Sequence, residues 1–541
     1  MSGPLVMPVE EPSTIIDELL REQRSLTAVE RFARLHDQHT LLASQPRYRS
    51  LLPLAAPAPG EQYAFEVDLD KCSGCKACVT ACHSLNGLEE SETWRSVGLL
   101  TGSTTLDLPS PISHLPSPIS DLRSPVSGVQ QHVTTACHHC ADPGCMNGCP
   151  VLAYDKDPVT GIVRHLDDQC IGCQYCVMKC PYDVPKYSKR LGIVRKCDLC
   201  SQRLAVGEAP ACAQACPNEA IRITLVELQE IISDTGFPPD SPNPSITRPT
   251  TRFRSARAVM TGLQPADAHE LRLSRAHWPL SVMLVLTQMA TGAVCVALFT
   301  ALHNVWLAWA ASGAAALGLM AATLHLGQPM KAWRGFLGWR KSWLSRELIA
   351  FGAVMPLLAG YALTLSPTLA AAAAVTGVLA VFCSAMIYVD TQRAFWSGWF
   401  TFPKFGLTMI QLGSACAWAA GSMTGLESVT GVCVVALLAA SILKLAGESA
   451  LVAWHARADR SPLRKTALLH TRRAGHWFKA RLAFTVLGGV LIPLAALTGL
   501  VSSAAMAAGA AWVLSLAGEI IERHLFFVCE SSPQMPGGIA A

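Results

Sequence analysis

CIGCQYCVMKCP, residues 170–181, contains four cysteines at the spacing C-x2-C-x2-C-x3-C, with a proline after the last one. Three cysteines on such a tight loop can hold three iron corners of a cubane [4Fe-4S] cluster, and the fourth ligates a different cluster in two-cluster ferredoxins. The same spacing occurs at residues 72–82. Two variant groups follow, at 137–149 and 197–216, with four and eleven residues between their second and third cysteines.

These sixteen cysteines predict four [4Fe-4S] clusters in an α+β ferredoxin-like domain. They are Cys72, Cys75, Cys78, Cys82, Cys137, Cys140, Cys145, Cys149, Cys170, Cys173, Cys176, Cys180, Cys197, Cys200, Cys212 and Cys216. A row of one-electron centres carries electrons between partners. The sequence shows no flavin or nicotinamide fingerprint, so the partners of this row are expected to lie outside the domain.

Zinc and disulfides are the alternative uses of these cysteines. Zinc sites also use C-x2-C pairs. A run of three cysteines followed by x3-C-P, however, is not a spacing that the tetrahedral coordination of zinc explains. Disulfides are disfavoured because the inferred compartment is reducing. His138 and His139 lie between two of the cysteines, yet sixteen cysteines already complete four ligand sets, so we expect a packing role for both.

Several basic residues adjoin the cysteines: Lys71, Lys76, Lys179, Arg195 and Lys196. They would raise cluster potentials by offsetting negative charge, whereas a solvated basic face is the simpler alternative.

The composition of the chain excludes a single soluble globule. Of its 541 residues, 51% are hydrophobic and 15% are charged, against about 45–50% and about 25% in soluble domains. The net charge of +4 gives little support to a nucleic-acid partner, which would require many phosphate-neutralising cations. We therefore expect contact with membrane lipid and no nucleic acid.

Eight apolar segments occur after Trp278, and each approaches the roughly 20 residues that a helix needs to cross a bilayer. They lie at about 278–301, 305–326, 348–366, 369–389, 404–423, 429–449, 482–500 and 502–521. The sequence thus predicts an all-α membrane domain of eight transmembrane helices. Lysines and arginines occur in the loops on one side and are absent from those on the other. The positive-inside rule then predicts a multi-pass protein of the inner (cytoplasmic) membrane with its iron–sulfur domain on the cytoplasmic side.

The remaining segments complete the domain organisation. Residues 1–60 are expected to form a helical extension, with helical periodicity at 14–36 and no signal peptide. Residues 61–227 form the four-cluster ferredoxin domain, interrupted at about 101–130 by a repeated Pro/Ser-rich surface insertion. The proline-rich stretch 228–276 is predicted to be a linker. The eight-helix anchor then covers 277–527, and a tail covers 528–541.

Ionisable residues inside a membrane domain are costly and therefore suggest function. His325 and Glu347, supported by Arg334 and Arg346, are our candidates for a site that oxidises a quinol near the clusters. The alternative for each of these four residues is a structural role, in which it satisfies a helix end or forms a salt bridge at the membrane interface. Haem is not expected, because only His325 lies near the interior of a span. No acidic residue lies in the half of any span that faces the basic-poor side, which favours electroneutral quinol oxidation.

Longer motifs resemble those of a known family. CSGCKACVTACHSLNG, CHHCADPGCMNGCP, CIGCQYCVMKCPYDVP and KCDLC resemble the iron–sulfur subunit of the dimethyl sulfoxide reductase family of molybdenum enzymes. HLGQP at 325–329, SWLSRE at 342–347 and GEIIERHLFF at 518–527 resemble that family's membrane anchor. The resemblance implies a fusion of two subunits that are usually separate.

The resemblance also implies ligand sets, a quinol site and a partner. The implied sets are Cys72, Cys75, Cys78 with Cys216; Cys82 with Cys197, Cys200, Cys212; Cys137, Cys140, Cys145 with Cys180; and Cys149 with Cys170, Cys173, Cys176. In the anchor family the matching histidine and glutamate, here His325 and Glu347, contribute to the quinol site. The implied partner is a molybdopterin catalytic subunit, with menaquinol or another quinol from the quinone pool as the electron donor.

Three functions follow from these patterns. The first is an electron-transfer and anchor subunit that oxidises quinol and passes electrons through four clusters to a separate catalytic subunit of the dimethyl sulfoxide reductase type. The second is a proton-translocating or quinone-reducing module of a respiratory complex. The third is a docking platform whose clusters only stabilise the fold. The terminal acceptor is not encoded here, because specificity lies in a separate chain.

Overall fold

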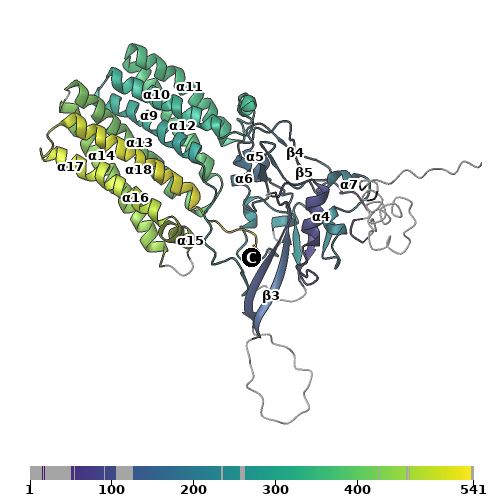
Figure 1. Ribbon diagram of the computed structural model, residues 1–541. Coiled ribbons are helices and arrows are strands. Elements are labelled where there is room, and N and C mark those ends of the chain that lie inside the picture. Colours follow the sequence, from purple (N-terminus) through teal and green to yellow (C-terminus); the bar gives the residue numbers. More distant parts are fainter. Residues whose placement is uncertain are drawn as a thin grey trace, which may run out of the picture.

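The computed structural model describes most of the chain and places the cysteine-rich domain at one end of a bundle of long helices (Figure 1). The described residues are 15, 18, 50–53, 55–90, 92–104, 126–232, 236–255, 262–425, 427–457, 461 and 463–537. The expected helix at 14–36 and the Pro/Ser repeat lie almost wholly outside them.

A three-stranded sheet forms one side of the ferredoxin domain. Strand β1 (Glu61–Asp68) pairs antiparallel with β8 (Ile221–Glu227), so that Phe65 faces Ile223. Their apolar side chains lie in the same buried cluster as several of the cysteines. The sheet thereby joins the start of the domain to its end.

Residues 228–276 are not a free linker as the prolines predicted. Within them, β9 (Arg252–Arg254) pairs parallel with β1, and β10 (Gln264–Pro265) pairs with β2 (Ser96–Thr104). The physical reason is that prolines are compatible with edge strands, where one side of the strand needs no hydrogen bonds. Phe253 of β9 is buried in the core of the ferredoxin domain.

A second sheet carries the insertion. β2 pairs antiparallel with β3 (Val126–Thr135) and the register shifts after Gly102. The Pro/Ser repeat falls between these two strands, outside the described residues.

Short helices and hairpins hold the cysteine loops. The helices are α4 (Ala77–Leu85), α5 (Gly144–Gly148), α6 (Tyr175–Lys179), α7 (Ser201–Ala205) and α8 (Ala211–Gln214). The hairpins are β4 (Tyr154–Lys156) with β5 (Val163–His165), and β6 (Lys186–Ser188) with β7 (Ile193–Arg195).

The second half of the chain is helical at every segment that hydropathy singled out. The long helices are α9 (Trp278–Thr300), α10 (Val305–Leu324), α11 (Trp343–Thr364), α12 (Pro367–Val389), α13 (Gly398–Thr424), α14 (Glu427–His455), α16 (Gly475–Val486) continued by α17 (Ile492–Leu497), and α18 (Ala504–Val528). Seven spans among the described residues are long and apolar enough to cross a membrane. The segment 404–423 lies within α13, which is not one of the seven, so the count of eight transmembrane helices stays a prediction.

The long helices pack as two groups. The first helix group contains α9–α12, and the second helix group contains α13, α14, α16, α17 and α18, with α9 and α13 in contact between them. α9 packs on α10, α12 and α13, and α13 also packs on α14 and α18. Glycines allow the closest approach, since a Cβ added at Gly292 of α9 would lie 2.0 Å from the carbonyl oxygen of Met409 on α13. Small residues let helix backbones approach in this way within membranes.

The tail returns to the ferredoxin domain. The amide of Leu99 on β2 donates to the carbonyl of Gly537 over 3.0 Å, and Met535 is buried in the ferredoxin core. The two domains are therefore joined by residues before α9 and again by residues after α18.

The two domains also meet at three glycines. Gly172 and Gly192, both with positive φ, belong to the ferredoxin domain, and Gly327 belongs to the loop after α10. A Cβ added at Gly327 would lie 2.0 Å from the carbonyl oxygen of Gly192. The side chain of Gln328 adds a hydrogen bond of 2.9 Å to the carbonyl of Leu191. Backbone thus packs directly on backbone at this junction.

Gly327→Ala is expected to weaken this junction, because the added methyl group has no space and the two backbones must separate. Overpacking of this kind costs about 1–3 kcal/mol. The thermal unfolding midpoint of the purified chain in detergent should fall. Gly313→Ala on α10 is the matched control, because a Cβ there has no neighbour within 4 Å. Equal midpoints for the two variants would contradict the importance of the glycine contact.

Candidate functional site

Two of the cysteine sets surround small cavities. Cys72, Cys75, Cys78 and Cys216 line one cavity, although Cys216 is far from the other three in sequence. A second cavity is lined by the set Cys137, Cys140, Cys145 and Cys180. The fourth member of each set therefore comes from a distant group.

The remaining eight cysteines form two further sets. Cys197 lies close enough to Cys82, Cys200 and Cys212 to interact with them electrostatically, and it interacts in the same way with Cys137 of a neighbouring set. Cys176 interacts in the same way with Cys149, Cys170 and Cys173. The structure thus brings Cys216 to Cys72, Cys75 and Cys78, and Cys180 to Cys137, Cys140 and Cys145, whereas the complete ligand sets and the count of four clusters stay predictions.

The two runs with identical spacing share a local backbone geometry. Lys76 follows the second cysteine of its run with φ 61°, and Gln174 occupies the same place in the other run with φ 59°. Each is the residue before a short helix, α4 or α6, that carries the next cysteine. The left-handed residue turns the chain sharply enough for three sulfurs to face one cavity.

The chemistry of these thiols fits iron–sulfur clusters. None of the 21 cysteines forms a disulfide. Burial raises the pKa of Cys82 to about 12 and that of Cys149 to about 11. Buried thiolates are costly unless a cation neutralises them, and iron supplies that charge. Within the described residues, no group of three or more His, Cys, Asp or Glu side chains could hold a single metal ion.

Among the five basic residues that adjoin the cysteines in sequence, Lys196 alone is buried. Its ammonium lies 3.6 Å from Sγ of Cys137 and donates 2.7 Å to the carbonyl of Cys197. Lys71 and Lys76 are exposed, as a solvated face would be. Lys179 pairs with Asp390 of the membrane domain. A charge enclosed beside two cysteine sets has a stronger effect on them than a solvated one.

Arg95 was missed by the sequence analysis because it is far from every cysteine motif. It is fully buried, stacks its guanidinium 4.5 Å above the ring of Phe65, and donates 3.1 Å to the hydroxyl of Thr134. That hydroxyl lies 3.6 Å from Sγ of Cys78. The pairing of β2 with β3, in which Val97 faces Thr134, brings the segment that follows Arg95 to Thr134.

His138 and His139 are packed into the ferredoxin domain. The ring of His138 contacts Tyr182 at 4.4 Å between centroids, and Nδ1 of His139 accepts from the amide of Val163 over 3.1 Å.

His325 lies at the junction of the two domains. It follows the last residue of α10, and its side chain lies near the backbone of Cys173. The centroid of its ring lies 5.1 Å from that of His277, and its Nε2 is buried with no partner among the described residues. Burial lowers the pKa of both imidazoles, that of His277 to about 4. A neutral imidazole with an unused ring nitrogen is thereby placed beside a cysteine loop.

Glu347 lies in the first turns of α11 and is 4% exposed. It lies near Ser384 of α12 and near Tyr175 and Tyr388. Tyr175 is the residue between Gln174 and Cys176, and its hydroxyl donates 3.3 Å to the carbonyl of Ile387. Glu347 is therefore connected to the same cysteine loop through a tyrosine, although it makes no direct contact with His325 that the described structure records.

Arg334 and Arg346 are not brought to His325. Arg346 donates to the carbonyls of Trp339 and Arg340 at 3.0 and 2.8 Å and stacks over Trp343, and Arg334 reaches only the carbonyl of Asp168 at 3.5 Å. The supporting role that the sequence suggested for these two arginines stays a prediction. Both stabilise loop backbone.

A cavity of about 670 Å³ opens at the same junction. Gln174 and Met178 line it from α6 and the preceding loop, and His277, Trp396 and Phe527 line it from the membrane domain. His277 therefore contacts both this cavity and His325.

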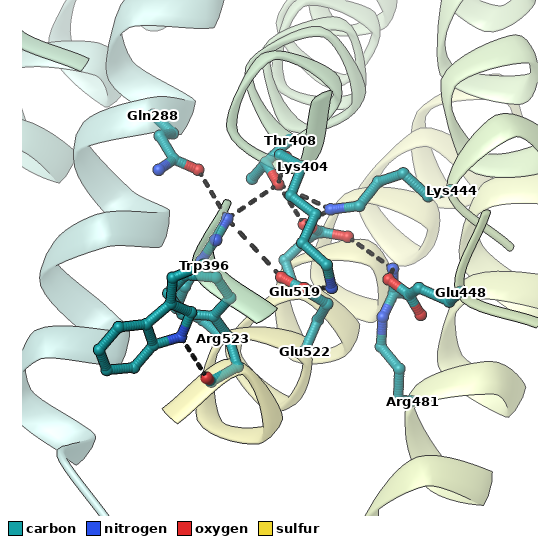
Figure 2. Close-up of polar contacts among 11 residues, drawn as sticks. Gln288, Trp396, Lys404, Thr408, Lys444, Glu448, Arg481, Glu519, Glu522 and Arg523 are labelled. Carbon is teal, nitrogen blue, oxygen red and sulfur yellow. Dashed lines mark hydrogen bonds and ion pairs between the residues drawn. The ribbon is translucent and has the colours of Figure 1, made fainter. Parts of the chain in front are cut away.

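A network of buried charges occupies the second helix group (Figure 2). Lys404 pairs with Glu522 at 2.5 Å, Lys444 pairs with Glu519, and Arg481 reaches Glu519 at 3.1 Å. No sequence motif predicted that these residues meet.

Comparison with known proteins defines the class to which this fold and these cysteines belong. Residues 129–225 match the model of a 4Fe-4S dicluster domain, and residues 274–528 match that of the dimethyl sulfoxide reductase anchor subunit. The chain is an iron–sulfur electron-transfer protein fused to a membrane anchor.

Individual relatives narrow this class. The B subunit of the anaerobic dimethyl sulfoxide reductase of Haemophilus influenzae is 34% identical over 167 residues, which cover 31% of this chain and 76% of that protein. The hydrogenase-2 operon protein HybA of Escherichia coli O157:H7 is 37% identical over 175 residues, 30% of this chain and 52% of HybA. The formate dehydrogenase-O iron–sulfur subunit of Escherichia coli K12 is 32% identical over 173 residues, 32% of this chain and 56% of that subunit. The matched region thus spans only about half the length of the latter two relatives.

This protein belongs to the dimethyl sulfoxide reductase family, in which it unites the iron–sulfur part with the anchor part.

Lys196→Met is expected to lower the midpoint potential of at least one cluster. A reduced cluster carries one more negative charge, which the buried ammonium stabilises, and a charge at this distance is worth on the order of 50 mV. Redox titration followed by EPR measures the shift. Lys71→Met is the control, because Lys71 is exposed and its charge is screened by solvent. A potential that stays constant in Lys196→Met would show that the lysine does not tune a cluster.

Proposed function

We propose that this chain oxidises a quinol in its membrane domain and passes the electrons through four [4Fe-4S] clusters to a separate catalytic subunit. The observation that carries the proposal is the contact between the loop that follows His325 and the loop that contains Cys173, in which the amide of Gln328 donates 3.0 Å to the carbonyl of Ile171. It joins the candidate proton acceptor to a loop that would ligate a cluster. Electrons and protons of a quinol can thereby leave at neighbouring positions.

Each of the four cysteine sets would hold one cluster. Cys149, Cys170, Cys173 and Cys176 form the set nearest the membrane, because the loop that contains Cys173 contacts the membrane domain. When bound, the clusters supply one-electron transfer.

The protein's own residues would bind the quinol and take its protons. Nε2 of His325 has no other partner among the described residues and can accept a proton from a quinol hydroxyl. Glu347, reached through Tyr175, is the second acceptor, so that the two protons of a quinol have two destinations. The junction cavity beside His277 gives water a route to the same place, along which protons can leave.

The partner is proposed to be a molybdopterin enzyme of the dimethyl sulfoxide reductase type, since both halves of the chain match that family. A relative at 32% identity is named as a subunit of a formate dehydrogenase, and a dehydrogenase withdraws electrons from its substrate. That likeness favours a second candidate function, in which electrons flow from the partner and reduce quinone. The match of residues 274–528 to a reductase anchor makes quinol oxidation the first choice.

His325→Ala is expected to slow cluster reduction by a menaquinol analogue at least about 100-fold, because loss of a positioned base costs about 10²–10⁴-fold. Cluster content and reduction by dithionite should be unchanged. Stopped-flow absorbance at the cluster bands measures the rate.

His303→Ala is the matched control. His303 lies at the opposite end of α10, where Nδ1 meets the hydroxyl of Tyr361 at 3.3 Å. Equal rates for the two variants would refute the site at His325. The wild-type clusters could instead stay oxidised with quinol and be reoxidised rapidly by quinone. That result would support electron flow from the partner to quinone.

The ferredoxin domain is proposed to face the cytoplasm, because the basic residues of the membrane domain lie in the loops on its side. Alkaline phosphatase inserted at Gly425 should be active and the same insertion after Ala456 inactive, since the enzyme folds only outside the cytoplasm. Gly425 ends α13 with φ 72° and has open space around it, so the insertion is tolerated there. The opposite pattern of activities would place the clusters outside the cytoplasm.

A further inference from the structure

A second cavity lies in the other helix group, away from His325. Its volume is about 260 Å³, and its walls come from α13, α14, α16, α18 and the segments before α13 and α16. It shares no lining residue with the junction cavity. A volume of this size approaches that of ordinary small-molecule sites.

The mouth of this cavity is accessible from the membrane. Trp399 on α13 and Leu443 on α14 line it and are 90% and 59% exposed. Large apolar side chains on the outer face of membrane helices face lipid. The cavity is lined by residues in the first turns of α13 and in the second half of α14.

Its inner walls are aromatic. His470 lies between Phe395 and Phe478, with centroids 5.6 Å away on both sides. All three side chains line the cavity. Such walls favour a flat ring over a flexible acyl chain.

The charges at the inner end of the cavity already have partners. Lys404 is paired with Glu522, Lys444 with Glu519, and Glu448 with Arg481 at 3.2 Å (Figure 2). An anionic phosphate would therefore have to break a buried ion pair, which is strongly unfavourable. A neutral ligand avoids this cost.

His470 presents an unused hydrogen-bond acceptor. Its Nδ1 lies 2.8 Å from the carbonyl of Thr466, so Nδ1 carries the proton and donates. Nε2 is then an acceptor in the neutral imidazole, and within the described residues it has no recorded partner. Burial lowers the pKa of His470 to about 4, which keeps the ring neutral. The ammonium of Lys404, at the same cavity, is a donor.

We propose that this cavity is a second binding site for a quinone or quinol, entered from the membrane between α13 and α14. A quinol hydroxyl donates to Nε2 of His470, and a quinone carbonyl accepts from Lys404. The ring lies against Phe395 and Phe478. The inference rests on the proposed function only in taking a quinone as the ligand class, because its residues are separate from His325 and Glu347.

Gly447 provides a way to fill the cavity. It lines the cavity on α14, and a Cβ added to it meets no atom within 4 Å. Gly447→Phe therefore projects a ring into the open space without disturbing the backbone. Gly431→Phe is the matched control, since Gly431 lies on the same helix, also has no neighbour within 4 Å, and does not line the cavity.

The experiment uses the full chain in phospholipid nanodiscs with a photoactivatable azidonaphthoquinone, and maps the labelled peptides by mass spectrometry. The wild type should be labelled in two places, around 325–347 and within 395–407 or 443–478. Gly447→Phe should reduce the second label at least 10-fold while Gly431→Phe leaves it unchanged. His470→Phe removes the hydrogen-bond acceptor and keeps an aromatic ring, so it should also reduce the second label. This variant replaces Gly447→Phe in the experiment if Gly447→Phe loses its clusters.

The outcomes separate this inference from the proposed function. Labelling only around 325–347 overturns the second site and leaves the proposed function in place. Labelling only in the second helix group supports the second site and overturns quinol oxidation at His325. Native mass spectrometry that finds a phospholipid retained by the wild type and lost from Gly447→Phe overturns the quinone assignment.

Discussion

Direct contact between two backbones fixes the geometry on which electron transfer in this protein depends. Gly172 and Gly192 of the ferredoxin domain pack against Gly327 without any side chain between them. Gly172 immediately precedes Cys173, and Gly327 follows His325 by two residues. The distance between imidazole and cysteine loop is therefore set by van der Waals contact of rigid chain segments, and flexible side chains have little influence on it. Lys179 and Asp390 add an ion pair of 2.7 Å at the same junction.

The buried charges of the second helix group pose a different physical problem. Three carboxylates (Glu448, Glu519, Glu522) and four cations (Lys404, Lys444, Arg481, Arg523) lie together. Their removal from water is costly, and pairing offsets only part of that cost. Several nitrogens of the two arginines have no partner among the described residues, which is the setting in which buried water is found. Stability alone gives no reason to keep such a network inside apolar helices.

The sequence predicted the parts that depend on local pattern. Cysteine spacing located the four groups, and hydropathy located every long helix, because both signals are complete within a short segment. Strand pairing is not local, so the contribution of 252–254 to the first sheet and the burial of Arg95 had no signal of their own. The direction of a long side chain also depends on its surroundings, which is why Arg346 was placed near the quinol site although its guanidinium caps loop carbonyls. The cavity at His470 was missed for the same reason, since its walls come from segments that are far apart in the sequence, between residues 395 and 525.

The return of the tail to the ferredoxin domain bears on how the protein is made. Met535 is part of the core that contains Phe65 and several of the cysteines, yet a ribosome synthesises it after every membrane helix. Proteins generally begin to fold from the N-terminus during synthesis. This domain, however, lacks part of its interior until α18 has been inserted and the following residues have emerged. Maturation of the iron–sulfur half is thus coupled to completion of the membrane half, so an incompletely inserted polypeptide keeps an open core that quality-control proteases can recognise.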